Sequence, residues 1–187
     1  LLTDPIAGIV QVIRNTADAT IWGVEIDGQI EILPGLLLEG SLGYVDGDYK
    51  NVVFDLNGDG VIDTDDASLQ IPRLANWTGN IGLIAEQEMD FGTLTGRVAY
   101  SHRDGAALTD NNLGFLNPSD RIDASVSFAL MDGDMTFTLY GKNLTNDVQH
   151  GGDTLLPDIL GPVPLGGTLA PLSRGRTFGI ELRLNSF

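Results

Sequence analysis

The chain has 187 residues, which is long enough for one domain with a core, and it carries a net charge of -16. Only 10 residues are Lys or Arg, which argues against nucleic acid or an anionic membrane surface as a partner, because phosphate groups need positive charge to bind. Cysteine is absent, so disulfide and thiolate chemistry are excluded. No apolar run approaches the roughly eighteen residues of a transmembrane helix, whereas a transmembrane strand needs only about ten alternating residues.

The chain starts without an initiator Met and without a basic segment followed by an apolar run. No signal peptide is predicted at this end. We expect the chain to be an internal piece or the mature C-terminal part of a longer protein.

Apolar and polar residues alternate at every second position in successive segments, which predicts strands with one apolar and one polar face. A short strand is predicted around residues 8–14. The clearest segment is 19–33, where Trp22 and Ile26 alternate with Glu25 and Asp27. The later predicted strands, in chain order, are 36–50, 73–88, 93–102, 120–130, 135–143 and a C-terminal strand that begins near Thr177.

The breaks between these strands alternate between short and long. Short turns are predicted at Pro34-Gly35, near Asp90 and at Asp132-Gly133-Asp134, and the long breaks are 51–71, 103–119 and 144–173. This alternation predicts an all-β, antiparallel, up-and-down transmembrane β-barrel segment, with every short turn and the C-terminus at one end. The strands also exceed the usual length of about five or six residues.

A soluble β-sandwich remains an alternative, because its strands alternate in the same way. Aromatic residues near the strand ends fit either interpretation, since they form interfacial girdles in a membrane barrel and core contacts in a sandwich. These residues are Trp22, Tyr44, Trp77, Tyr100 and Phe115.

Five segments, each in a predicted strand or at a strand end, resemble the C-terminal third of TonB-dependent outer-membrane receptors in amino-acid sequence and in their order along the chain. The resemblance covers nearly the whole chain. The segments are 19–26 (ATIWGVEI), 33–36 (LPGL), 43–49 (GYVDGDY), 139–146 (LYGKNLTN) and 175–182 (GRTFGIEL).

This resemblance implies an energy-coupled importer whose barrel has about 22 strands and is plugged by an N-terminal domain. Residues 1–187 would then be the C-terminal portion of that barrel, about seven or eight strands, in the outer membrane of a Gram-negative bacterium. The implied partners are outer-membrane lipid, a TonB-type energy-coupling protein that acts through the plug, and a small nutrient ligand. That ligand would be a siderophore-iron complex, cobalamin or an oligosaccharide. The plug and its coupling box are not in this sequence.

The terminal Phe187 resembles the aromatic end that the barrel-assembly machinery reads in this family. Phe178, Ile180 and Leu182 are even-numbered positions on the apolar face of the last predicted strand, whereas Phe187 is an odd-numbered position and would point to the opposite face. A bulge near Asn185 would restore Phe187 to that face.

A calcium-type loop lies within the first long break, at 51–71. The twelve residues 55–66 follow the spacing of ligand positions in such loops, and Gly60 occupies the position of the sharp turn. The alternative is a solvated acidic turn. The predicted calcium ligands are Asp55, Asn57, Asp59, the backbone carbonyl of Val61, Asp63 and Asp66. We expect a structural ion, since extracellular sites can have dissociation constants as weak as about 0.1 to 1 mM and still be filled.

No catalytic arrangement is predicted, and we expect the protein not to be an enzyme. His102 and His150 are far apart in sequence, and acidic residues such as Glu25 and Glu39 are explained by a polar face that lines a watery lumen. We expect ligand contacts in the rim loops 104–112 and 151–165. Two other functions stay open: a soluble calcium-stabilised β-sheet module for binding or adhesion, and a passive porin-like barrel.

Overall fold

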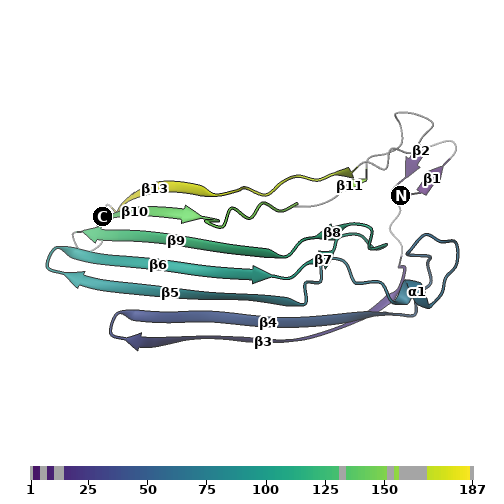
Figure 1. The fold of residues 1–187 in the computed structure, drawn as a ribbon, viewed down its shortest axis with the longest axis horizontal. Coiled ribbons are helices and arrows are strands. Elements are labelled where there is room, and N and C mark those ends of the chain that lie inside the picture. Colours follow the sequence, from purple (N-terminus) through teal and green to yellow (C-terminus); the bar gives the residue numbers. More distant parts are fainter. Residues whose placement is uncertain are drawn as a thin grey trace.

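The structure is a computed structural model that describes residues 2–4, 8–10, 15–130, 134–150, 154–155 and 168–185. Seven strands form one antiparallel sheet in which neighbours along the chain lie side by side (Figure 1). The strands are β3 (Asp18–Leu33), β4 (Leu36–Lys50), β5 (Trp77–Met89), β6 (Gly92–Arg103), β9 (Ser119–Leu130), β10 (Met135–Lys142) and β13 (Thr177–Leu184). The sheet is open, with β3 and β13 at its edges, as expected for a segment of a larger barrel.

The remaining elements are short. Six short strands form three two-stranded sheets: β1 (Leu2–Asp4) with β2 (Gly8–Val10), β7 (Ala106–Ala107) with β8 (Phe115–Leu116), and β11 (Thr154–Leu155) with β12 (Thr168–Leu169). The helix α1 (Thr64–Ala67) has four residues. In the part of the chain that the structure describes, no helix has the length and apolar character needed to cross a membrane.

The strand register divides the sheet into an apolar and a polar face. Directly paired residues share a face, so the pairs Val24 with Tyr44 and Ile26 with Leu42 extend the apolar face from β3 to β4. This face stays open: the exposed fraction is 67% for Ile26 and 70% for Ile180. Because no second sheet packs on these side chains within the described ranges, the fold is a single-layer barrel wall and not a sandwich.

The ends of the sheet differ as the sequence predicts. The reversals from β3 to β4 and from β5 to β6 lie at one end, together with the end of β9, the start of β10 and the end of β13 (Figure 1). We call this the short-turn end and the opposite one the long-loop end. Gly35 makes the first reversal with φ of 75°, in the left-handed region that glycine enters without strain. Residues Asp132 and Gly133 of the third predicted turn lie outside the described residues, as does Phe187.

One predicted boundary was wrong for a local reason. The strand predicted from Arg73 begins at Trp77, because Arg73 is in the left-handed region (φ 62°) and its N–H donates to the Ala107 carbonyl in another loop at 2.7 Å. The break predicted at 103–119 lies between β6 and β9, and it also contains the short pair β7 and β8. Of the short strand predicted at 8–14, the structure describes Gly8–Val10.

The buried apolar residues of the described ranges lie in the loops and not on the sheet. They gather at the long-loop end, in the connection between β4 and β5 and in the connection between β6 and β9. These residues are Leu56, Ala75, Ala106, Ala107 and Leu108. The two loops therefore contain the closely packed part of this structure.

Candidate functional site

The acidic loop, residues 55–66, curls around its own carboxylates. The two carboxylate oxygens of Asp55 accept hydrogen bonds from the N–H groups of Gly58 and Gly60, at 2.7 and 2.8 Å. The Asn57 side-chain oxygen accepts from the N–H of Asp59 at 2.9 Å. Gly60 has φ of 93°, so the residue at the predicted sharp turn does adopt a conformation that other residues avoid.

The end of the acidic loop is the start of α1. Asp63 caps the helix by accepting from the N–H of Asp65, and the Asp66 side chain accepts from the N–H of Asp63, which completes a capping box. The other Asp66 oxygen accepts from the N–H groups of Leu56 and Asn57, at 2.7 and 3.0 Å. Asp66 is completely buried, and these backbone donors, with Asn57 the largest cause, lower the pKa of its carboxyl group.

These contacts define how the loop fits a cation. Its side chains offer only hard oxygen donors, which suit calcium. Asp66 uses three of its roughly four lone-pair sites for backbone N–H groups, so it has at most one left for a metal. Among the described residues, no three Asp, Glu, His or Cys side chains converge as a metal-binding group. Asp66 thus holds the loop in its conformation through hydrogen bonds to the backbone. The carboxylates of the predicted ligands do not by themselves form a ready metal-binding group in the described residues.

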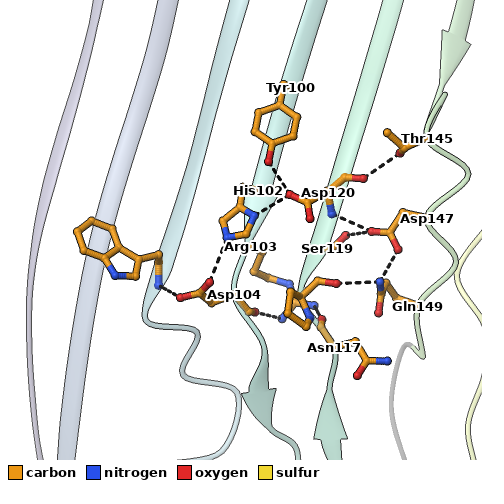
Figure 2. Close-up of polar contacts among 12 residues, drawn as sticks. Tyr100, His102, Arg103, Asp104, Asn117, Ser119, Asp120, Thr145, Asp147 and Gln149 are labelled. Carbon is orange, nitrogen blue, oxygen red and sulfur yellow. Dashed lines mark hydrogen bonds and ion pairs between the residues drawn. The ribbon is translucent and has the colours of Figure 1, made fainter.

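A second polar cluster lies where β6 and β9 reach the long-loop end (Figure 2). The two ring nitrogens of His102 lie 2.7 Å from Asp120 and 3.0 Å from Asp104. The Tyr100 hydroxyl donates to Asp120 at 2.5 Å. Because a carboxylate only accepts hydrogen bonds, both contacts of His102 are satisfied when its imidazole is doubly protonated. Asp104 also accepts from the N–H of Trp77, so the cluster joins β5, β6 and β9.

The segment after β10 is tied to the same strand ends. Asp147 accepts from the Ser119 hydroxyl at 2.6 Å and from the N–H of Asp120 at 2.9 Å, and Gln149 donates to its other oxygen (Figure 2). The Ser119 hydroxyl is the largest of the contacts that lower the pKa of Asp147. Thr145 donates to the Asp120 carbonyl at 2.8 Å. The chain leaving β10 is therefore anchored on the start of β9.

Asn143 begins a tight turn after β10, in which the N–H of Asn146 donates to the Asn143 carbonyl at 2.8 Å. It is buried with φ of 51°, a conformation that asparagine tolerates better than most residues. Its side-chain amide donates to the carbonyls of Asp147 and Arg174 at 2.9 and 3.0 Å, and its side-chain oxygen accepts from the N–H of Asp147. The segment 139–146, which carried part of the resemblance, thus has a structural role that sequence reasoning did not assign. The signal available was an Asn, Thr and Asp cluster directly after a strand.

The two histidines belong to different places in the fold. His102 is held between two carboxylates, and His150 forms an isolated bridge with Leu172. The predicted rim loop 104–112 contains β7 and the buried residues around it. Of the other predicted rim loop, 151–165, only Thr154–Leu155 lies within the described residues.

Three of the predicted girdle aromatics come together. Trp22, Tyr44 and Trp77 form a row across β3, β4 and β5, with ring centroids 5.4 and 4.7 Å apart. Tyr100 lies on the same face but bonds to Asp120, and Phe115 lies in β8, away from the main sheet. A second aromatic contact, Phe91 with Phe128 at 5.7 Å, lies near the short-turn end. Aromatic residues thus border the apolar face at both ends, as in membrane barrels.

Comparison with known proteins agrees with this architecture. The family model described as "TonB dependent receptor-like, beta-barrel" matches residues 1–144. The crystal structure of the ferric yersiniabactin uptake receptor FyuA from Yersinia pestis is similar with a TM-score of 0.75 and 17% identity, over 92% of this chain and 24% of that one. The chain thus spans about a quarter of the length of that receptor. No curated protein sequence matches it. With its single-layer sheet and the family match over most of its length, the chain belongs to the TonB-dependent receptor-like β-barrel family.

Proposed function

We propose that the chain forms part of the wall of a TonB-dependent transporter that imports a scarce nutrient across the outer membrane of a Gram-negative bacterium. The observation that carries this proposal is the two-faced single sheet: apolar side chains such as Val24 and Ile26 are open on one face, and charged side chains such as Glu39 and Arg97 lie on the other. In such a wall the first face contacts lipid and the second lines the lumen. Receptors of this family are transporters and not enzymes.

The nutrient is a siderophore-iron complex, cobalamin or an oligosaccharide. The fold of the ferric yersiniabactin receptor supports an iron chelate as the first compound to test. Energy would come from a TonB-type coupling protein that acts on the plug. The long-loop end, with its loops 51–76 and 104–118, would face the outside and meet the ligand first.

Uptake by the full-length protein tests this proposal. Cells that carry the gene, and matched cells that lack it, receive radioactive ferric siderophores, labelled cobalamin or labelled oligosaccharides. We expect saturable uptake of one of these that stops when the proton-motive force is collapsed or the coupling protein is deleted. Uptake that is unsaturable and survives both treatments would instead indicate a passive porin-like barrel.

We also propose that the acidic loop binds a structural calcium ion. Six residues have the spacing of calcium ligands, and the ligand oxygens of Asp55 and Asn57 are already turned into the curl of the loop by backbone N–H groups. Clustered carboxylates repel one another, so a divalent cation would stabilise this conformation. The ion would order a loop on the outer rim of the barrel.

A further inference from the structure

The two loops at the long-loop end hold each other in place. We call residues 51–76 the first loop and residues 104–118 the second loop. The Arg73 N–H of the first loop donates to the Ala107 carbonyl of the second at 2.7 Å. The Asn112 side chain pairs with the backbone of Gln70 in both directions, accepting from its N–H at 2.6 Å and donating to its carbonyl at 2.9 Å.

Apolar burial accompanies these hydrogen bonds. Leu56 and Ala75 of the first loop, and Ala107 and Leu108 of the second, are all buried. Segments that bury apolar side chains and satisfy their backbone groups open less readily than solvated loops. The two loops are therefore held in place before any ligand binds. A preformed site costs less free energy to occupy than one that must first become ordered.

A pocket of about 390 Å³ lies between the two loops and is also lined by Thr16, which precedes β3. Its size is within the range of about 300 to 1,000 Å³ that small-molecule sites occupy. Phe54, Leu56 and Leu108 supply an apolar lining, and Asp55, Asp110 and Asn111 supply polar groups.

The charge of the pocket selects its ligand. Its lining includes no Lys or Arg. The Asp110 side chain is exposed and, within the described ranges, its carboxylate accepts no hydrogen bond. A carboxylate in this situation attracts a positive charge or a hydrogen-bond donor and repels an anion.

We propose that this pocket binds a small ligand, or part of one, that has an apolar body and a positively charged group. This inference rests on the proposed function, because it places a contact site for the imported nutrient at the outer rim. It adds a chemical class: a cationic group is preferred over an anionic chelate at this point. Asp110 provides the charge contact, and Phe54, Leu56 and Leu108 contact the apolar body.

Binding of simple probes to the purified full-length protein tests the inference. The probes are hexylammonium, hexanol and hexanoate, which share a six-carbon body and differ in charge, and saturation-transfer NMR detects their binding. We expect hexylammonium to bind most tightly and hexanoate least. Asp110→Asn should weaken hexylammonium by up to about fivefold, as for one exposed charge pair. Asp90→Asn is the control, because it removes the same charge at the short-turn end.

A Leu108→Ala variant adds a second readout. It should weaken hexylammonium and hexanol alike, since both lose the same apolar contact, while Asp110→Asn should spare hexanol. Equal binding of hexanoate, or equal losses from Asp90→Asn and Asp110→Asn, would overturn the inference. If energy-coupled uptake is found and none of the probes binds, the pocket assignment fails and the transport proposal stands. If the probes bind as expected and no energy-coupled uptake is found, the pocket assignment stands and the transport proposal fails.

Discussion

The guanidinium of Arg97 in β6 lies 2.6 Å from the carboxylate of Glu39 in β4, although β5 runs between these two strands. Gly82 of β5 is the direct partner of Glu39, and a Cβ atom at Gly82 would stand 2.8 Å from the carboxylate oxygen. Because Gly82 has no side chain, the Glu39 and Arg97 side chains have room to meet across β5. One contact on the polar face ties three strands together.

This ion pair should contribute modestly to stability. In a double-mutant cycle of Glu39→Gln and Arg97→Gln, we expect a coupling free energy of about 0.2 to 1 kcal/mol, because both side chains are partly exposed and water screens them. Urea unfolding of the full-length protein in detergent measures it. The pair Glu181 and Arg183, at 3.3 Å along a single strand, should couple more weakly. A larger coupling for the latter pair would contradict this expectation.

Gly179 should not tolerate a side chain. It is the direct partner of Tyr140, and a Cβ atom there would overlap the tyrosine ring. Gly179→Ala should lower the free energy of unfolding by about 1 to 3 kcal/mol, as overpacking does. Gly96→Ala is the matched control, because a Cβ there meets no atom within 4 Å. In a Tyr140→Ala background the cost of Gly179→Ala should disappear, and persistence of the cost would show that the ring is not its cause.

Asn143 should be needed for the tight turn after β10. Asn143→Ala removes two donated hydrogen bonds and puts alanine at φ of 51°. We expect a loss of about 1 to 3 kcal/mol and faster amide exchange at Leu144 and Asp147. Asn143→Gly keeps the backbone conformation and loses only the amide, so it should cost less than Asn143→Ala. The reverse order would show that the backbone conformation is not limiting.

The acidic loop should lose order in acid. Its Asp66 carboxyl has a lowered pKa in the folded loop, because backbone N–H groups stabilise the charged form. The stabilisation is complete above the unfolded pKa of about 3.9 and is lost as the pH falls through the folded pKa, since protonation then removes the acceptor. Amide exchange of Leu56 and Asn57, corrected with an unstructured peptide of the same sequence, should speed up below about pH 4. Unchanged protection there would contradict this role of Asp66.

Calcium should slow amide exchange in residues 55–66. Titration calorimetry of the full-length protein should show one site with a dissociation constant of about 0.1 to 1 mM. Asp59→Ala should weaken binding at least tenfold, because Asp59 is a predicted ligand and its exposed side chain is not part of a packed core. Asp65→Ala, which changes an acidic residue outside the predicted ligand positions, is the control and should have a small effect. No heat and no change in exchange at millimolar calcium would rule out the site.

Much of the fold could be predicted because alternation is a local property. Each residue of β4 projects to a face set by its parity, so the bounds 36–50 and the faces of Leu38 and Glu39 follow from the sequence alone. The start of β5 could not be predicted in this way. The segment from Arg73 alternates like a strand, but the Arg73 N–H bonds to Ala107, which is distant in sequence.

The candidate sites also differ in whether their residues are close together or far apart in the sequence. The acidic loop could be recognised because its ligand positions lie within twelve consecutive residues, but the sequence did not show that Asp66 is buried and saturated by backbone donors. The cluster around His102, Asp104 and Asp120 could not be predicted, because the partners come from β6, the following loop and β9.

By itself, the sequence determined the seven alternating strands, the order of short and long connections and the family, since each depends on neighbouring residues or on their order. Only the tertiary structure decided which loops contact each other, where a pocket forms between Leu56 and Leu108, and which carboxylates share a partner. The physical reason is that these contacts join residues from different strands and loops. Their energies depend on distances that the folded chain sets and that no local pattern encodes.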